Sequence, residues 1–165
     1  MEISIQSELT EDESNHLFNW SECVFPIEGG EFEWAKPQRS IVARDNGLAI
    51  AHIGFGLFKV IGDNEKTVIG VGAVVVRPEY QGQGIPEKMF DVLNATRVLN
   101  GAREAKTLFC PGSLVSYYER HGYKEYCYAV KFMQKNGYTQ TDKFRFMVRG
   151  NLGFFCEVSI PSFPW

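Results

Sequence analysis

The segment of this sequence best suited to chemistry is a glycine-bearing loop between an apolar run and an amphipathic helix. The apolar run ends in Val74-Val75-Val76, the loop spans residues 77–83, and helical spacing continues from Ile85 to Asn100. A strand, a loop and a helix start in this order direct backbone N–H groups and the positive end of the helix dipole at one point. The sequence therefore predicts a phosphate-binding loop.

Three antiparallel strands are expected to lead up to this loop. Asp45-Asn46-Gly47 is a strong hairpin signal between strands over residues 40–44 and 48–61, and a turn at 62–65 leads into a strand over 66–76. Gly70 and Gly72 lie inside that third strand, where glycine indicates a bulge or the close approach of a neighbour. A strand over 2–6 and a helix capped by Thr10 come before them.

The chain after the loop predicts a change in strand direction. The helix is expected to end at Gly101 and to cross back to a parallel strand over residues 106–110. Ligands tend to bind where such a sheet changes direction. The remaining expected elements are a short helix over 113–121 and strands over 126–133, 144–148 and 154–160. The order predicts one domain over 1–165, of class α/β (α+β), with helices flanking a mixed sheet.

Composition narrows the function classes. The 165 residues suit one globular domain, and the net charge of −3 with a pI near 5.7 argues against nucleic acid as a partner. Cys23, Cys110, Cys127 and Cys156 form no CxxC pair, so we expect reduced thiols and no metal site. The start of the chain lacks a signal-peptide pattern and no apolar run has membrane length, so the expected location is cytoplasmic, away from membranes.

Residues 76–85, VRPEYQGQGI, resemble the acetyl-CoA motif of the GNAT superfamily of N-acyltransferases, Gln/Arg-x-x-Gly-x-Gly/Ala. Gln81 and Gly84 fit this motif, whereas Pro86 replaces its final small residue. The resemblance implies a GNAT fold with a parallel strand pair at an acetyl-CoA cleft. In that family the loop holds the pyrophosphate and the preceding strand pairs with the pantetheine arm. The implied cofactor-binding residues are Val74, Val75, Val76, Gln81, Gly82, Gln83, Gly84, Ile85 and Pro86. Because proline has no N–H, we expect cofactor binding to be weaker by about 1–3 kcal/mol.

A second match covers residues 118–123, YERHGY, which resemble the Tyr-x-x-x-Gly-Phe/Tyr segment of the same family. The spacing selects Tyr118, and the resemblance implies that it is a general acid for the leaving thiolate. Helix periodicity alone does not choose between Tyr117 and Tyr118. For Tyr117 the alternative is packing in the core.

Two subfamilies resemble the chain over more than the motif. Residues 49–53 and the ending from Phe155 to Trp165 are similar to aminoglycoside 2′-N-acetyltransferases, while residues 31–32 and 35–37 are similar to the rhizobial nodulation N-acyltransferase. Both act on an amino group of a sugar, which implies a small-molecule amine as substrate. The aminoglycoside enzymes carry an acid at the position of Gly72, so a base must be found elsewhere.

The replacement bases considered are Glu31, Glu33 and Glu157, with Glu33 as the first candidate, acting through a water. His52 and His121 are bases in principle. However, His52 in an apolar strand is typical of a buried core histidine, and His121 lies where a helix dipole stabilises it. The terminal carboxylate of Trp165 is either a contact for a cationic sugar or part of a flexible tail. The implied substrate-contacting residues are Glu31, Glu33, Trp34, Gly72, Cys110, Glu157 and Trp165.

The leading hypothesis is an acetyl-CoA-dependent N-acetyltransferase that acts on a primary amine of an amino sugar or aminoglycoside-like molecule, by direct attack in a ternary complex. Tyr118 is the predicted acid and Glu33 the predicted base. One alternative is transfer of a longer acyl group to an amino-sugar oligomer. Another is a GNAT-fold binding or regulatory protein that lost its base at Gly72 and its cofactor at Pro86. A homodimer is compatible with each of these hypotheses.

Overall fold

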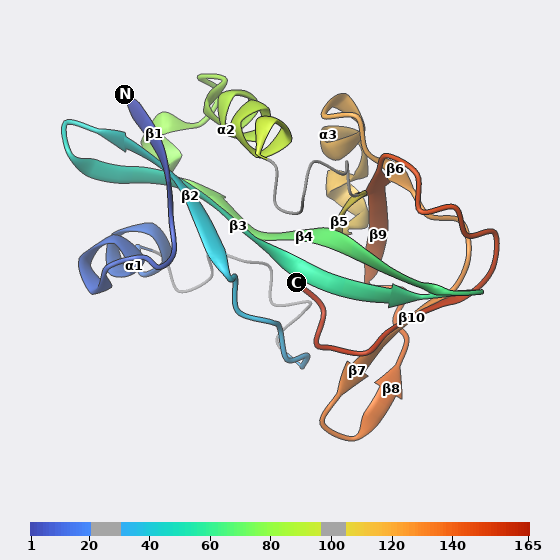
Figure 1. The fold of residues 1–165 in the computed structure, drawn as a ribbon. Helices are drawn as coiled ribbons and strands as arrows, with labels where there is room; N and C mark the ends of the chain where they lie inside the picture. Colours follow the sequence, from blue (N-terminus) through green and yellow to red (C-terminus); the bar gives the residue numbers. More distant parts are fainter. Residues whose placement is uncertain (21–30, 97–104) are drawn as a thin grey trace. The chain divides into compact units, whose positions relative to one another are not determined.

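The computed structural model describes residues 1–20, 31–96 and 105–165, which form two compact units. The described residues of the first unit are 1–20, 37–55 and 72–96, and those of the second are 31–36, 56–71 and 105–165. Two long strands, β3 (Leu48–Ile61) and β4 (Glu65–Val76), contribute to both units (Figure 1). The structure confirms the predicted mixed α/β class with helices beside a mixed sheet.

The first unit begins with an antiparallel arrangement of three strands. β1 (Glu2–Gln6) pairs with β2 (Arg39–Asp45), and β2 pairs with the start of β3. The predicted hairpin is confirmed, because Asn46 and Gly47 both have the positive φ angles that a tight turn of this kind needs. Figure 1 shows α1 (Glu11–Phe18) and α2 (Ile85–Ala95) on opposite faces of these strands.

Both helices of the first unit bury one apolar side. Thr10 caps α1 in a capping box with Glu13, and Leu17 packs in a buried cluster with Val42, Ala49 and Val75. The four buried residues of α2 recur at helical spacing; they are Ile85, Met89, Phe90 and Leu93. Burial of these stripes, rather than helix propensity, holds such short helices in place.

The second unit is built on the parallel crossover that the sequence predicts. β4 and β5 (Lys106–Pro111) are parallel, with Ile69, Gly70 and Val71 opposite Lys106, Thr107 and Leu108. The described strand order is β6-β9-β5-β4-β3-β10-β7-β8. The other strands are β6 (Lys124–Glu125), β7 (Val130–Gln134), β8 (Gly137–Thr139), β9 (Phe144–Arg149) and β10 (Val158–Ile160). A second parallel pair, β10 with β7, was not expected from the sequence.

The last residue of the chain belongs to the core of the second unit. Trp165 is 6% exposed; its ring stacks on Phe58 with ring centroids 4.3 Å apart and donates from Nε1 to the Thr107 carbonyl at 3.0 Å. Gly70 makes room for these rings, since a Cβ there would lie 2.5 Å from both Phe58 and Trp165. The alternative of a flexible tail is therefore wrong, and one of the two strand glycines marks a close approach.

Several element bounds differ from the expectation. α2 ends at Ala95 because Thr96 is extended, and its hydroxyl donates to the Val92 carbonyl at 2.8 Å. The continuation to Asn100 and Gly101, like Cys23, lies outside the described residues. The final strand starts at Val158 rather than near residue 154, after a segment in which Gly150 and Gly153 are left-handed. Within residues 1–20, 31–96 and 105–165, no helix has the length and apolar character needed to cross a membrane.

Candidate functional site

The loop after β4 folds back on itself through its own side chains. Residues Pro78–Tyr80 form a 3-10 turn, the Gln81 amide donates to the Val76 carbonyl at 3.1 Å, and the Gln83 amide donates to the Glu79 carbonyl at 3.1 Å. The side chains of both glutamines are thus engaged with nearby main-chain carbonyls. The backbone around Gly82 and Gly84 is left facing outward.

Two left-handed glycines bring this backbone to the start of α2. Gly82 and Gly84 have φ angles of 73° and 69°, and Gly84 is the N-cap residue of a helix that no side chain caps. A Cβ at Gly82 would meet nothing within 4 Å, and one at Gly84 would meet only a Glu87 carboxylate oxygen at 3.8 Å. Uncapped N–H groups at a helix start, with open space beside Gly82 and Gly84, suit an anionic group such as a phosphate. Pro86 lies in the first turn and supplies no N–H.

The strand that enters the loop contains a kink that the sequence did not locate. Ala73 has a φ of 48°, which costs a residue with a side chain about 1–2 kcal/mol. Gly70 and Gly72 were the predicted bulge positions, yet the left-handed residue is their neighbour. Gly72 itself is half-buried, with its carbonyl close to Gly54. As a glycine it supplies no carboxylate at the position where the aminoglycoside enzymes carry an acid.

The kink is in contact with a buried histidine of the same unit. His52, 2% exposed, lies with Nδ1 2.7 Å from the Ala73 carbonyl and Nε2 2.9 Å from the Ser40 hydroxyl. Burial lowers the pKa of His52, against the smaller opposing effects of the Ala73 carbonyl and the Glu13 charge. The prediction of a core histidine with satisfied hydrogen bonds is confirmed.

This lowered pKa predicts a loss of stability in mild acid. Above the ordinary histidine value of 6.5 the His52 site is neutral in both folded and unfolded chains. As the pH falls below that value, the unfolded chain takes up a proton that the folded chain does not. The free energy of unfolding should then fall by up to about 1.4 kcal/mol per pH unit.

Urea denaturation of wild type and His52→Asn between about pH 7 and pH 5 measures this effect. The other histidines are the same in both proteins, so the difference between the two slopes belongs to His52. Identical slopes would contradict the lowered pKa.

In the second unit, Tyr118 lies on the short helix α3 (Val115–Arg120) and is 6% exposed. Its ring meets the Tyr117 and Tyr123 rings edge-on, with centroids 5.1 and 6.0 Å away. Burial, followed by the neighbouring Tyr117, raises the pKa of Tyr118 well above its ordinary value. The hydroxyl therefore keeps its proton throughout the neutral and mildly alkaline range.

The segment that carries the predicted substrate contacts is also part of the second unit. Its main chain is tied down on two sides, because Glu33 exchanges hydrogen bonds with the Gln134 amide and the Ala35 N–H donates to the Pro164 carbonyl. Trp34 is 37% exposed and lies edge-on to Phe144, with ring centroids 5.1 Å apart. An exposed tryptophan thus stands beside the C-terminal segment.

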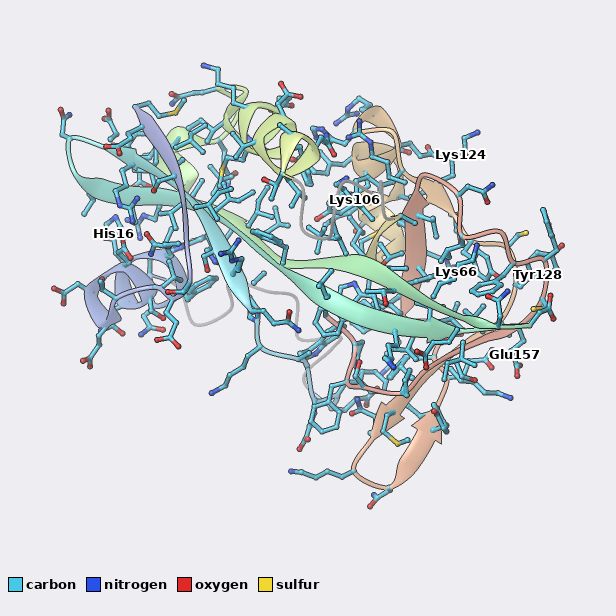
Figure 2. All side chains as sticks on the ribbon, in the orientation of Figure 1. His16, Lys66, Lys106, Lys124, Tyr128 and Glu157 are labelled. Atoms are coloured by element: carbon cyan, nitrogen blue, oxygen red, sulfur yellow. The ribbon has the colours of Figure 1, made fainter. Side chains whose placement is uncertain are left out.

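The three candidate glutamates each form an ion pair with a lysine. Glu33 pairs with Lys135 and Glu31 with Lys143, while Glu157 pairs with Lys131 at 2.6 Å. Lys131 is near the start of β7 and Gln134 is its last residue, so Glu157 lies apart from Glu33. Figure 2 shows Glu157 near Tyr128. The structure brings Glu31, Glu33 and Trp34 together on one segment and leaves Glu157 out.

Two further candidates have limited chemistry. Cys110 is 1% exposed, and burial, then the Glu125 charge, raises its pKa to about 11, so the thiol stays protonated and is a poor nucleophile near neutral pH. Trp165 as a whole is packed in the core of the second unit. Among the residues the structure describes, no cluster of His, Cys, Asp and Glu could hold a metal ion.

The chain resembles known proteins over a region that includes the loop. A family model described as "Acetyltransferase (GNAT) domain" matches residues 36–125, more than half of the chain. The chain is also 31% identical over 96 residues to the "Uncharacterized N-acetyltransferase YjhQ" of Escherichia coli (strain K12). That match covers 57% of this chain and 50% of the relative, so the chain matches only about half the length of this curated relative.

Solved structures share the fold over most of the chain. Escherichia coli ElaA superposes with a TM-score of 0.61 at 15% identity and covers 91% of this chain and 100% of its own. A GNAT family acetyltransferase from Brucella melitensis, solved in complex with acetyl-CoA, has a TM-score of 0.51 at 25% identity, covering 91% of this chain and 90% of its own.

Proposed function

Because the chain belongs to the GNAT family of acetyltransferases, we propose that it transfers an acetyl group from acetyl-CoA to a primary amine. The observation that carries this proposal is the pair of left-handed glycines, Gly82 and Gly84, in front of the uncapped start of α2. Support also comes from the similarity to the Brucella melitensis protein that binds acetyl-CoA. Val74–Val76 would pair with the pantetheine arm, and residues 81–86 would surround the pyrophosphate.

The proposed acceptor is an amino sugar or an aminoglycoside-like small molecule. Trp34 offers an exposed aromatic face, which suits both the apolar side of a sugar ring and an ammonium group. Glu31 and Glu33 stand next to it and would attract a cationic amine in exchange for their lysine partners. The similarity of residues 49–53 and of the chain ending to aminoglycoside 2′-N-acetyltransferases supports the same class.

Acetyl-CoA, when bound, supplies a thioester whose carbonyl carbon an amine can attack. For this step, Glu33 would accept the proton of the attacking amine through a water, because a free electron pair on nitrogen is needed. Tyr118 would hold its proton for the sulfur that leaves when the C–S bond breaks, and its raised pKa keeps that proton in place until then. The protonated state of Cys110 supports direct transfer rather than an acylated cysteine.

The test begins with binding and ends with turnover. Acetyl-CoA at a hundred times its dissociation constant should stabilise the protein by about 2.7 kcal/mol, which a thermal shift detects. Thiol release is then measured with aminoglycosides, glucosamine oligomers, polyamines and peptides as acceptors, and with acetyl and longer acyl donors. Turnover with amino sugars supports the proposal, whereas turnover with peptides alone would overturn the substrate class.

A second candidate function is a GNAT-fold binding or regulatory protein. The lysine partners of Glu31 and Glu33, the absence of an acid at Gly72 and the missing N–H of Pro86 favour it. This candidate expects no thermal shift with millimolar acetyl-CoA, or a shift without thiol release for any acceptor. The two functions therefore give different results in the same pair of measurements.

Replacing Glu33 tests the proposed base. Glu33→Gln should lower kcat by about 10–100-fold at saturating amine, because general-base catalysis contributes about that much or more. Glu31→Gln is the matched control, since it removes a carboxylate that is also exposed and paired with a lysine, two residues away on the same segment. Equal kcat values for the two variants would exclude Glu33 as the base.

A further inference from the structure

The left-handed conformation of Ala73 needs a cause outside the residue itself. In the described residues, Asn46 and Ala73 are the non-glycine residues with positive φ. Asn46 lies in a tight turn, where its side chain tolerates this conformation, but alanine has no polar side chain to offset the strain. Strain of this kind persists only where the surrounding structure holds it in place.

His52 supplies a hydrogen bond of defined direction at this point. A main-chain carbonyl can only accept, so Nδ1, 2.7 Å from the Ala73 oxygen, must carry the proton. In the neutral ring Nε2 then accepts from the Ser40 hydroxyl at 2.9 Å. The Ala73 carbonyl therefore fixes the tautomer, and the Ser40 hydroxyl complements it by donating to the other ring nitrogen.

The imidazole ring is fixed in position by its neighbours in the first unit. Phe18 of α1 meets it edge-on with centroids 5.5 Å apart, and both His52 and Ser40 are buried on the paired strands β3 and β2. Because Phe18 and Ser40 limit the movement of the ring, the position of Nδ1 is fixed, and with it the position of the Ala73 carbonyl that Nδ1 binds.

The other end of the short segment after Ala73 is fixed as well. The Arg77 N–H donates to the Ile50 carbonyl at 2.9 Å, and the Arg77 guanidinium donates to the carbonyl of His16 on α1, which Figure 2 labels. Val74–Val76, the proposed partner of the pantetheine arm, lies between these two anchors. Its direction therefore depends on the His52 bond at one end and on Arg77 at the other.

We propose that His52 is a positioning residue for acetyl-CoA: its hydrogen bond holds the kink at Ala73, and the kink aims the N–H and C=O groups of Val74–Val76 at the cofactor. This inference rests on the proposed function, because it assumes that the segment pairs with acetyl-CoA. Ser40 is the second member of the chain of hydrogen bonds, since its hydroxyl donates to Nε2 in the tautomer that the Ala73 carbonyl requires.

Two amide variants separate positioning from packing. The Nδ2 of asparagine falls where Nδ1 of histidine lies, so His52→Asn retains the donor to Ala73. In His52→Gln the amide falls near Nε2 and cannot replace that donor. We expect the dissociation constant for acetyl-CoA, measured by calorimetry, to rise about tenfold in His52→Gln and less than threefold in His52→Asn.

A second substitution tests the link to the kink. Glycine adopts a positive φ without strain, so Ala73→Gly should restore most of the lost affinity in the His52→Gln background. If His52 acts through packing alone, Ala73→Gly should not restore the affinity, and His52→Asn and His52→Gln should weaken binding equally. Either result would overturn the proposal.

The backbone itself gives a readout that does not need the cofactor. Amide–Hα couplings and carbon shifts of Ala73 report its φ, and ring nitrogen shifts report the His52 tautomer. We expect a left-handed Ala73 and a protonated Nδ1 in wild type, and a shift of Ala73 towards ordinary strand values in His52→Gln. If Ala73 stays left-handed in His52→Gln, the proposal is overturned, whether or not the protein binds acetyl-CoA. A wild-type protein that does not bind acetyl-CoA would instead contradict the proposed function.

Discussion

Gly84→Val is expected to weaken acetyl-CoA binding by about 100-fold. Valine strongly disfavours the φ of 69° at this position, and its side chain would project into the open space in front of the α2 N-terminus. Charge-assisted hydrogen bonds to the pyrophosphate are worth about 1.5–3 kcal/mol each, and the loss of one or two of them gives this change in affinity. Isothermal titration calorimetry with acetyl-CoA measures it directly.

The matched control is Gly47→Val in the turn between β2 and β3. Gly47 is also left-handed, at φ 81°, and a Cβ there meets nothing within 4 Å. Both variants should lose stability from the same backbone strain, whereas only Gly84→Val should lose cofactor. Similar affinities in the two variants would refute the loop as the pyrophosphate site. If Gly84→Val does not fold, Gly82→Ala, at φ 73°, tests the same loop with less strain.

Tyr118→Phe is expected to lower kcat by about 100-fold or more while changing the KM for acetyl-CoA by less than about threefold. A proton donor to the leaving sulfur acts during bond breaking, so its loss appears in kcat rather than in binding. The raised pKa adds a second expectation. Because the pKa of Tyr118 lies above the ordinary tyrosine value of 10.0, deprotonation of Tyr118 should cause no loss of activity at any pH up to 10.

Two tyrosines of the same unit serve as controls for this substitution. Tyr123→Phe removes a hydroxyl from another buried tyrosine whose ring meets that of Tyr118, and burial raises the pKa of Tyr123 as it does that of Tyr118. Tyr117→Phe tests the alternative that helix periodicity left open. The acid role of Tyr118 is rejected if its variant turns over as fast as Tyr123→Phe, or if Tyr117→Phe alone is slow.

The ion pairs of Glu31 and Glu33 bear on how a substrate would enter. Exposed pairs of this kind are worth at most about 1 kcal/mol, so a cationic amine can displace Lys135 or Lys143 at little cost. A carboxylate exchanging one ammonium partner for another needs no change in the fold. The lysines therefore do not by themselves prevent substrate binding.

Local chemistry made part of the fold and of the site predictable. The Asp45-Asn46-Gly47 turn, the Thr10 cap and the loop at residues 77–84 depend on residues that are neighbours in sequence, and the structure has each in place. The helical spacing after the loop likewise predicted α2 itself. Its end was not predictable in the same way: Thr96 leaves the helical conformation, while its N–H and its hydroxyl both donate to the Val92 carbonyl.

The features that only the tertiary structure decided involve segments far apart in the chain. Nothing near Glu33 in sequence indicates that it meets Lys135, and nothing near Trp165 indicates that its ring is buried against Phe58. The kink at Ala73 is the clearest case. Its alanine is a poor choice for a positive φ, and the strain is tolerated because a histidine 21 residues earlier donates to its carbonyl. Sequence alone thus predicted the strand-loop-helix segment through its local backbone needs, whereas the direction of the strand before the loop follows from packing between β2, β3 and β4.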